Sequence, residues 1–130
     1  MAYYFSTILP FGFDEAVRRV TEALRQEGFG IITEIDVKQT LKAKIGVDFR
    51  NYRILGACNP ALAYEALQVE DKVGTMLPCN VVVQERDARK TEIAVIDPVA
   101  SMQAIDNPRL KHAAEQVQFR LKKVVDSLKS

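Results

Sequence analysis

Two runs of residues in the second half of the chain place the strongest limit on its fold. Residues 79–84 and 91–96 carry apolar side chains at every second position, and the charged segment Arg86–Lys90 separates them. This spacing is typical of strands with one buried face, and so short a connection joins antiparallel strands. If Glu85 faces Thr91, Val81 faces Val95 and the two apolar sets share one face. We predict a hairpin that helices cover on that face only.

Two long helices are predicted from apolar residues at helical spacing. The first follows Gly12 and ends at Gly28, a residue type that favours the left-handed turn closing a helix. The last begins at Asn107–Pro108, where asparagine can cap the helix and proline fits its first position. Its apolar stripe consists of Leu110, Ala113, Ala114, Val117, Leu121, Val124 and Leu128. Each helix therefore presents one face to a core.

The remaining segments complete an α+β order of elements. Asp36, Asn59 and Asp97 are expected to cap short helices, and Gly74–Pro78 to form a loop. The other predictions are strands at Tyr3–Leu9, Phe29–Ile35 and Tyr52–Cys58, helices at Val37–Lys44 and from Pro60, and a turn or helix from Pro98 through Met102. We expect a mostly antiparallel sheet of about five strands, backed by helices. With 130 residues and 48% hydrophobic content, residues 1–130 are expected to form a single domain.

Composition argues against several classes of protein. The 18 Lys and Arg nearly balance the 17 Asp and Glu, so we expect no nucleic-acid or anionic-membrane partner. The apolar start, Met1–Pro10, lacks the basic residues of a signal peptide, and two cysteines do not form the disulfide framework of a small secreted domain. No apolar run approaches the roughly 18 residues of a transmembrane helix. These features predict a cytoplasmic protein.

Four residues predicted at strand ends form the candidate ligand site. They are Cys58, Asn59, Cys79 and Asp97. A thiolate is favoured near a helix N-terminus, so Cys58, just before the Asn59–Pro60 helix start, is the better candidate nucleophile or soft-metal ligand. The alternative is that both cysteines are small core residues, because free cysteine is among the most buried residue types. No cofactor, catalytic or nucleotide-binding motif accompanies them.

Two further groups are weaker candidates for the chemistry. Asp97 could act as a general base, but an aspartate before proline is first a turn residue. His112, the only histidine, falls off the core stripe of the last helix, where a surface or interface position is expected. A metal site would need Cys58 and Cys79 to meet with a third ligand, and their 21-residue separation provides no local ligand spacing.

Two apolar features predict self-association. The strand Tyr52–Cys58 is apolar on both faces, as in a sheet covered on both sides. Phe119 points away from the core stripe of the last helix. A homodimer that buries the second sheet face, the Phe119 side of the helix, or both would account for them. Isolated exposed aromatics are nevertheless common.

With these motifs identified, the chain resembles the domain-of-unknown-function 302 family of small bacterial and archaeal proteins. The resemblance spans nearly the whole chain and rests on Glu27–Phe29, Asp36–Lys42, Tyr52–Pro60, Leu77–Cys79 with the following valines, and Asp97–Pro98. It implies a compact α+β domain that forms dimers, and it implies no established activity. His112 belongs to none of these motifs.

Three functions remain open from the sequence. The first is a homodimeric binding domain that holds a small ligand, or a soft metal through Cys58 and Cys79. The second is a thiol-dependent enzyme of sulfur or redox chemistry, assisted by Asp97 or His112. The third is a subunit whose apolar surface binds another protein.

Overall fold

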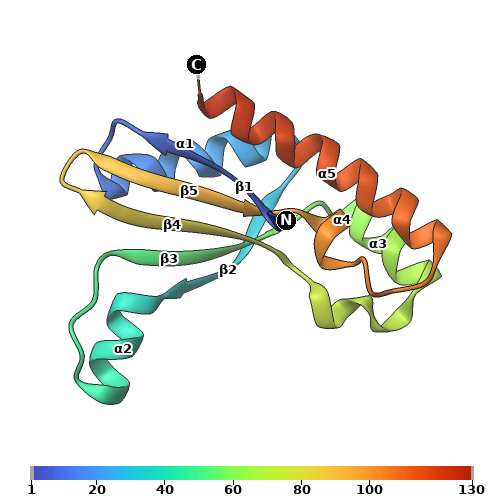
Figure 1. Ribbon diagram of the computed structural model, residues 1–130, viewed down its shortest axis with the longest axis horizontal. Coiled ribbons are helices and arrows are strands. Elements are labelled where there is room, and N and C mark those ends of the chain that lie inside the picture. Colours follow the sequence, from blue (N-terminus) through green and yellow to red (C-terminus); the bar gives the residue numbers. More distant parts are fainter. Residues whose placement is uncertain (1, 130) are drawn as a thin grey trace.

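Five strands form one antiparallel sheet in the order β1-β5-β4-β3-β2 in the computed structural model of residues 2–129 (Figure 1). The strands are β1 (Tyr4–Leu9), β2 (Gly30–Asp36), β3 (Tyr52–Cys58), β4 (Cys79–Asp87) and β5 (Lys90–Ile96). The helices are α1 (Phe13–Gln26), α2 (Val37–Ile45), α3 (Pro60–Val69), the 3₁₀ helix η1 (Asp71–Met76), α4 (Pro98–Ser101) and α5 (Pro108–Leu128). The predicted α+β class is confirmed. Residues 1 and 130 of the predicted domain lie outside the described part.

The predicted hairpin register is confirmed, but the turn is shorter than expected. Val81 pairs with Val95 and Val83 with Ile93. The strands continue to Asp87 and Lys90, so the charged segment predicted as a loop is mostly strand. A bulge between Glu85 and Asp87 brings the strand ends together, and the Asp87 carboxylate accepts a hydrogen bond from the Arg89 amide at 2.9 Å. Charged residues thus extend the hairpin where it reaches solvent.

One face of the sheet is covered by α1 and α5, which also pack against each other (Figure 1). The side chains beneath these helices have no exposed surface: Val81, Val83, Ile93 and Val95. Gly28 ends α1 with a φ of 86°, and the Phe29 amide donates to the Leu24 carbonyl at 2.9 Å. The glycine cap predicted from the sequence therefore turns the chain directly into β2.

The opposite face of the sheet, called here the open face, has no such helical layer. The strand registers assign to it Tyr4, Ser6 and Ile8 of β1, Glu92, Ala94 and Ile96 of β5, Asn80, Val82 and Gln84 of β4, Tyr52 and Ile54 of β3, and Thr33 and Ile35 of β2. Tyr52 and Ile54 are only half-buried. Within the described chain, no helix covers the first half of this strand on its second face, and its burial by a second copy stays a prediction.

The second half of β3 is covered at Gly56, because two segments approach it closely. A Cβ atom at this position would lie 2.0 Å from Thr33 Oγ1 and 2.6 Å from Pro78 Cγ. The β2–β3 register shifts between Ile31 and Thr33, which brings Thr33 opposite the glycine. Only a residue without a side chain fits between the bulge and the chain entering β4.

A second hydrophobic cluster lies beyond the end of the sheet. It joins α3, η1, α4 and α5 through Ala66, Val73, Met102, Leu110 and Ala114. Leu121, Val124 and Val125 on the same α5 belong to the main cluster under the sheet. The 21 residues of α5 span about 31 Å, so one helix crosses both clusters. The helix η1, which was not predicted, overlaps the predicted loop Gly74–Pro78 at residues 74–76.

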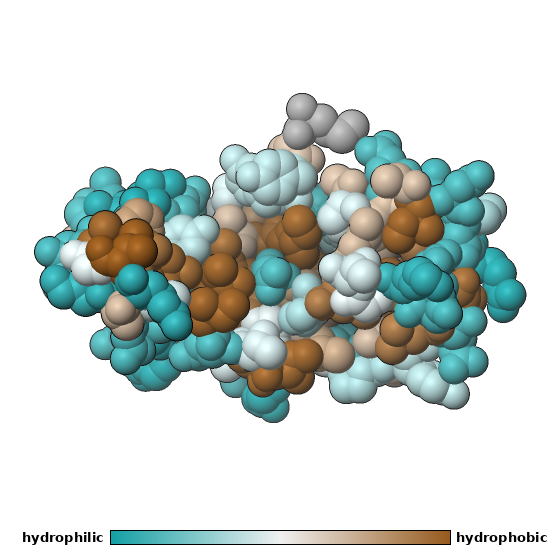
Figure 2. Space-filling model, turned by 90° about the horizontal axis from the view of Figure 1, so that it is seen from below, coloured by the Kyte–Doolittle hydropathy of each residue, from teal (hydrophilic) through white to brown (hydrophobic). Residues whose placement is uncertain are grey.

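Helix α2 is the element least covered by the rest of the protein. Its bounds match the prediction to within one residue, and the Asp36 side chain caps it by accepting from the Gln39 amide at 2.9 Å. None of its nine residues is buried, and its main contacts are with β2 and β3. Ile45 and Val47 at its end are exposed. Figure 2, seen from below, shows a hydrophobic patch on the left, over this part of the molecule.

Candidate functional site

A pocket of about 340 Å³ lies between the two hydrophobic clusters. On one side it is lined by Phe29, Ala57 and Cys79 of the main cluster, and on the other by Met102 and Leu110 of the second cluster. None of the described residues that line it is charged. The volume is at the lower end of the range for small-molecule sites, about 300–1,000 Å³.

Small side chains on two helices create this space. Ala63 and Ala66 of α3 and Ala113 and Ala114 of α5 all line it. A wall built from leucines instead would fill much of the volume, because each substitution adds about three methyl or methylene groups. Ala113 and Ala114 belong to the predicted apolar stripe of the last helix, but nothing in the sequence indicated that the two helices leave a gap. The helical walls of the pocket were therefore not predicted, although a ligand site at the strand ends was.

Cys79 is the buried thiol of the pocket. It is the first residue of β4, it pairs with Ala57 of β3, and it follows the cis Leu77–Pro78 bond. Burial, with a smaller contribution from the charge of the Cys58 thiolate, raises the pKa of Cys79 to about 11. Removing an ionised sulfur from water is unfavourable, so this group is a neutral thiol at neutral pH.

Cys58 is the more accessible thiol. It is the last residue of β3, directly before the cap of α3, and is half-buried in the wall of the same pocket. Because Ala57 is the residue opposite Cys79, Cys58 is one position out of register on the neighbouring strand. Consecutive residues of a strand point to opposite faces, so this register opposes a disulfide. Both cysteines line the pocket because it lies at the strand ends.

Asn59 is the third predicted site residue that lines the pocket. It caps α3, with its side-chain oxygen accepting a hydrogen bond from the Leu62 amide at 3.2 Å. Its amide nitrogen would lie 3.0 Å from a Cβ placed on Gly28, so the left-handed glycine leaves room for it. Asn59 therefore fixes the start of α3 and gives the pocket its one side-chain amide among the described lining residues.

Asp97 lies outside the pocket, contrary to its predicted place beside the thiols. Its carboxylate caps α4 by accepting from the Val99 and Ala100 amides at 3.0 and 3.4 Å. The Gln118 side-chain amide donates to the same oxygen at 3.0 Å. Only the following residue, Pro98, lines the pocket. Three donors on one carboxylate oxygen agree with a helix cap. Of the two interpretations offered for Asp97, a general base and a turn residue, the structural one therefore agrees better with these contacts.

His112 also lies away from the thiols. It is exposed on α5, and its Nε2 is 3.0 Å from the Gln116 side-chain nitrogen. Together with Tyr64 and Arg109 it lines a separate groove between the outer sides of α3 and α5. The surface position expected from the helical stripe is therefore correct, and His112 is not placed to assist either cysteine.

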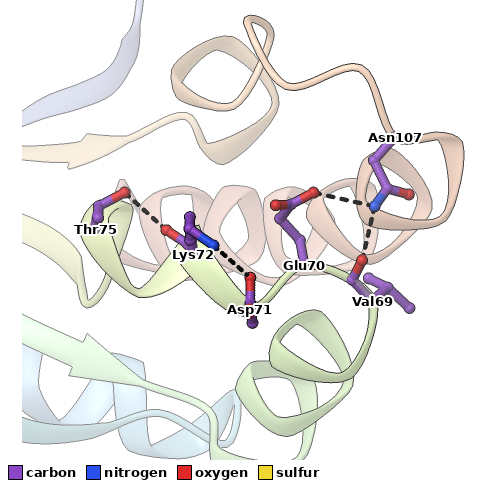
Figure 3. A network of polar contacts seen from close by, with 6 residues as sticks. All are labelled: Val69, Glu70, Asp71, Lys72, Thr75 and Asn107. Atoms are coloured by element: carbon purple, nitrogen blue, oxygen red, sulfur yellow. Dashed lines mark hydrogen bonds and ion pairs between the residues drawn. The ribbon is translucent and has the colours of Figure 1, made fainter.

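Asn107 ties the α3–η1 wall of the pocket to the start of α5. Its side-chain oxygen caps α5 by accepting from the Arg109 and Leu110 amides at 3.1 and 3.3 Å. Its side-chain nitrogen donates to the Val69 carbonyl at 2.8 Å and to the Glu70 carboxylate at 3.3 Å (Figure 3). The sequence predicted the cap but not the second pair of bonds.

Residues 2–129 contain neither a clustered metal site nor a membrane-spanning helix. No group of three or more histidine, cysteine, aspartate or glutamate side chains is arranged to hold a metal ion. No helix in this part of the chain is long and apolar enough to cross a membrane.

Comparison with known proteins identifies the family of the chain. The family described as a domain of unknown function, DUF302, matches residues 5–128. The chain belongs to the DUF302 family. This confirms the resemblance seen in the sequence, and the match includes every element of this DUF302 domain except the first residue of β1.

A solved structure supports the assignment. The crystal structure of an uncharacterised conserved DUF302 protein from Bacillus stearothermophilus matches with a TM-score of 0.88 and 31% sequence identity. The match covers 97% of this chain and 98% of the other. No curated protein matches the chain. The family and the fold are therefore established, and neither name describes an activity.

Proposed function

We propose that this DUF302 domain binds a small, uncharged and largely apolar molecule in the pocket between its two hydrophobic clusters. The observation that supports this proposal is the lining itself, which is apolar apart from two thiols and the Asn59 side chain. An ionised ligand would lose its hydration there without a charged partner, at a cost of several kcal/mol. A neutral ligand loses little hydration free energy, and the removal of its apolar surface from water favours binding.

The residues of the pocket suggest how such a ligand would be oriented. The polar part of the lining consists of the side-chain amide of Asn59 and the thiols of Cys58 and Cys79. The Asn59 oxygen is used by the cap of α3, which leaves its amide nitrogen as a donor for a carbonyl or ether oxygen. We therefore expect a ligand with an apolar body and one hydrogen-bond acceptor.

A pair of alanines on one helix provides the test. Ala63 lines the pocket, whereas Ala61, two positions earlier on α3, is exposed and lies outside it. The neutral dye N-phenyl-1-naphthylamine, whose fluorescence rises in apolar surroundings, serves as the probe. We expect binding to the wild-type protein and to Ala61→Phe, and at least a tenfold loss of affinity in Ala63→Phe because the ring occupies the pocket.

Two results would contradict this proposal. One is equal dye affinity in both phenylalanine variants, with circular dichroism showing that both are folded. The other is an affinity for an anionic dye of similar size, such as 1-anilinonaphthalene-8-sulfonate, that equals or exceeds the affinity for the neutral dye. The first result would place the dye elsewhere on the protein, and the second would contradict the preference for uncharged ligands.

The two thiols support a second candidate function, the binding of a soft metal ion such as copper(I). Both line one pocket, and they are close enough for the charge of one to raise the pKa of the other. Against it, Cys79 must lose a proton that burial holds strongly. The thiol-dependent enzyme is less well supported, because its two predicted bases, Asp97 and His112, lie outside the pocket.

Serine variants separate these possibilities. If the thiols bind copper(I), Cys58→Ser and Cys79→Ser should each lose the ion while keeping the dye. If only the apolar pocket functions, both variants should bind the dye like the wild-type protein, and the wild-type protein should bind no copper(I) in competition with a chelator such as bathocuproine disulfonate.

A further inference from the structure

A second hollow, of about 610 Å³, adjoins the pocket where α5 begins. It is lined by the loop that follows α4 and by the first turns of α5. Two residues, Met102 and Ala114, line both the pocket and this hollow, so they form the wall between the two spaces. Together the two volumes come close to the upper end of the range for small-molecule sites, about 1,000 Å³.

The wall between the pocket and the hollow consists of side chains that can give way. Ala114 contributes only a methyl group. The main chain of Met102 is fixed, because its amide donates to the Pro98 carbonyl at 3.1 Å and its carbonyl accepts from the Ile105 amide at 3.0 Å. Its side chain, by contrast, is unbranched and has three rotatable bonds. Rotation about these bonds would join the two spaces without any movement of the main chain.

The two spaces differ in polarity. The described lining of the pocket has no charged residue, whereas Gln103, Asp106 and Lys111 line the hollow and are exposed. One acid and one base give no net charge, so the hollow favours neither an anion nor a cation. A group that both donates and accepts hydrogen bonds, such as a hydroxyl or a primary amide, finds partners of both kinds there.

The exposed part of the pocket's own lining offers no such partners. Its large side chains that reach solvent are apolar: Ile32 is 60% exposed and Leu67 is 42% exposed. A polar end group of a ligand at this rim would make no hydrogen bond with either side chain. The hollow is therefore the neighbouring space that suits a second polar group.

Helix α3 gives the distance between Asn59 and the hollow. Asn59 caps the start of α3, and the Asn107 side chain donates to the carbonyl of Val69, the last residue of α3, at 2.8 Å (Figure 3). Because Asn107 lines the hollow, the two places lie about one α3 length apart. Ten helical residues span about 15 Å. An extended chain advances about 1.2 Å per bond, so about twelve bonds connect the two places.

We propose that the pocket and the hollow together bind a linear, uncharged chain molecule about twelve bonds long, with a hydrogen-bond acceptor at one end and a hydroxyl or amide at the other. This ligand class rests on the function proposed above, the binding of an uncharged molecule in the pocket. The acceptor receives a hydrogen bond from the Asn59 side-chain amide, and the apolar chain passes Met102. The far end group lies in the hollow beside Gln103 and Lys111.

Three neutral esters test the length of the ligand and its second polar group. Methyl 12-hydroxydodecanoate has a carbonyl at one end and a hydroxyl at the other, methyl dodecanoate lacks the hydroxyl, and methyl 6-hydroxyhexanoate is too short to reach the hollow from Asn59. Displacement of the dye N-phenyl-1-naphthylamine measures the affinity of each. We expect the long hydroxy ester to bind at least fivefold more tightly than either of the others. Transfer out of water alone would favour methyl dodecanoate, so this order requires a partner for the hydroxyl.

A tryptophan in the hollow tests the position of the far end group. Ala104 is exposed and lines the hollow, and it is not among the described residues that line the pocket. We expect Ala104→Trp to bind the dye like the wild-type protein and the long hydroxy ester at least tenfold more weakly, because the indole ring occupies the hollow. Ala88→Trp, the matched control, places the same ring on an exposed alanine of the β4–β5 turn and should bind both like the wild-type protein.

The outcomes distinguish this proposal from the one on which it rests. Suppose that Ala63→Phe lowers the affinity for the dye. Equal binding of methyl dodecanoate and the long hydroxy ester, or equal binding of that ester by Ala104→Trp and Ala88→Trp, would then overturn the extension into the hollow and leave the pocket as the ligand site. An Ala63→Phe variant that binds the dye like the wild-type protein would overturn both proposals.

Discussion

Burial gives Cys79 an acid–base behaviour that should be visible in the stability of the whole protein. Its pKa is about 11 in the folded state, above its ordinary value of 9.0. Below about pH 9 the thiol is protonated in both folded and unfolded chains, and its ionisation has no effect on the free energy of unfolding. Between about pH 9 and 11 only the unfolded chain releases the proton, so the free energy of unfolding falls by up to about 2–3 kcal/mol.

Replacing the thiol isolates this contribution from the lysines and tyrosines that titrate in the same range. Urea unfolding of the wild-type protein and Cys79→Ala should be compared at about pH 8 and about pH 11. We expect the wild-type protein to lose more stability than the variant over this interval. An equal loss in both would mean that Cys79 ionises as easily in the folded as in the unfolded chain.

Gly56 should be the glycine least tolerant of a side chain. A Cβ there would collide with Thr33 and Pro78, whereas a Cβ at Gly30, on the neighbouring strand, has no atom within 4 Å. We expect Gly56→Ala to lower the free energy of unfolding by about 3 kcal/mol or more. Gly30→Ala should change it by less than about 1 kcal/mol. Urea denaturation of the two variants tests this, and similar values would show that the bulge can relax.

Single residues with a strong local preference were predicted well from the sequence. Asn59, Asp97 and Asn107 all cap helices, because each precedes a proline that fits the first helical position. Their second contacts could not be predicted, because the partners are distant in the chain. Gln118 reaches Asp97 across 21 positions, and Asn107 reaches Val69 across 38. Local chemistry specifies the cap, and only the fold specifies the other partner.

At the scale of elements, Asn107 connects α5 to the α3–η1 segment, and two variants separate its roles. Asn107→Asp keeps the oxygen that caps α5 but loses the donor to Val69 and places a second carboxylate beside Glu70. Asn107→Ala loses both. We expect Asn107→Ala to cost about 1–3 kcal/mol of stability. Both variants should speed hydrogen exchange in residues 71–76, and unchanged exchange there would contradict the connection.

Helices with a one-sided apolar stripe and strands with alternating residues were predicted almost to their ends. Strand β3 and the start of α5 have the predicted bounds. The helix η1 was missed because a 3₁₀ turn produces no long apolar period. The last residues of β4 were missed because Arg86 and Asp87 are charged. Consecutive charged residues between two apolar runs usually indicate a turn. The hydrogen bonds of the ladder outweigh this preference once the strands are paired.

At the scale of the molecule, α5 joins two clusters that should differ in their response to the same mutation. Leu110 and Leu121 are both fully buried on this helix, in the second and the main cluster respectively. We expect either alanine substitution to cost about 2–5 kcal/mol. Hydrogen exchange should distinguish them: Leu110→Ala should loosen α3 and η1 selectively, and Leu121→Ala the sheet. Uniform loosening by both would show one cooperative unit.

The candidate site belongs to this scale, which is why the sequence identified it only in part. Cys58, Asn59 and Cys79 were expected together because strand ends converge, and all three line the pocket. The opposite wall comes from α5, whose apolar stripe was predicted only as a core face, and from Met102, which was predicted only as the end of a turn or helix. A cavity depends on how two helices are spaced, and the apolar period of each helix alone carries no information on that spacing.

The strand order has a consequence for how the chain is made. Strand β1 leaves the ribosome before the other four strands of the sheet, yet its hydrogen-bonding partner is β5, the last of the five. At about 5–20 residues per second, Tyr4 waits on the order of ten seconds before Ile96 is synthesised. During this interval Tyr4 and Ile8 have no strand to pair with. The nascent chain therefore carries an unpaired strand that chaperones can bind, and its sheet closes late in synthesis.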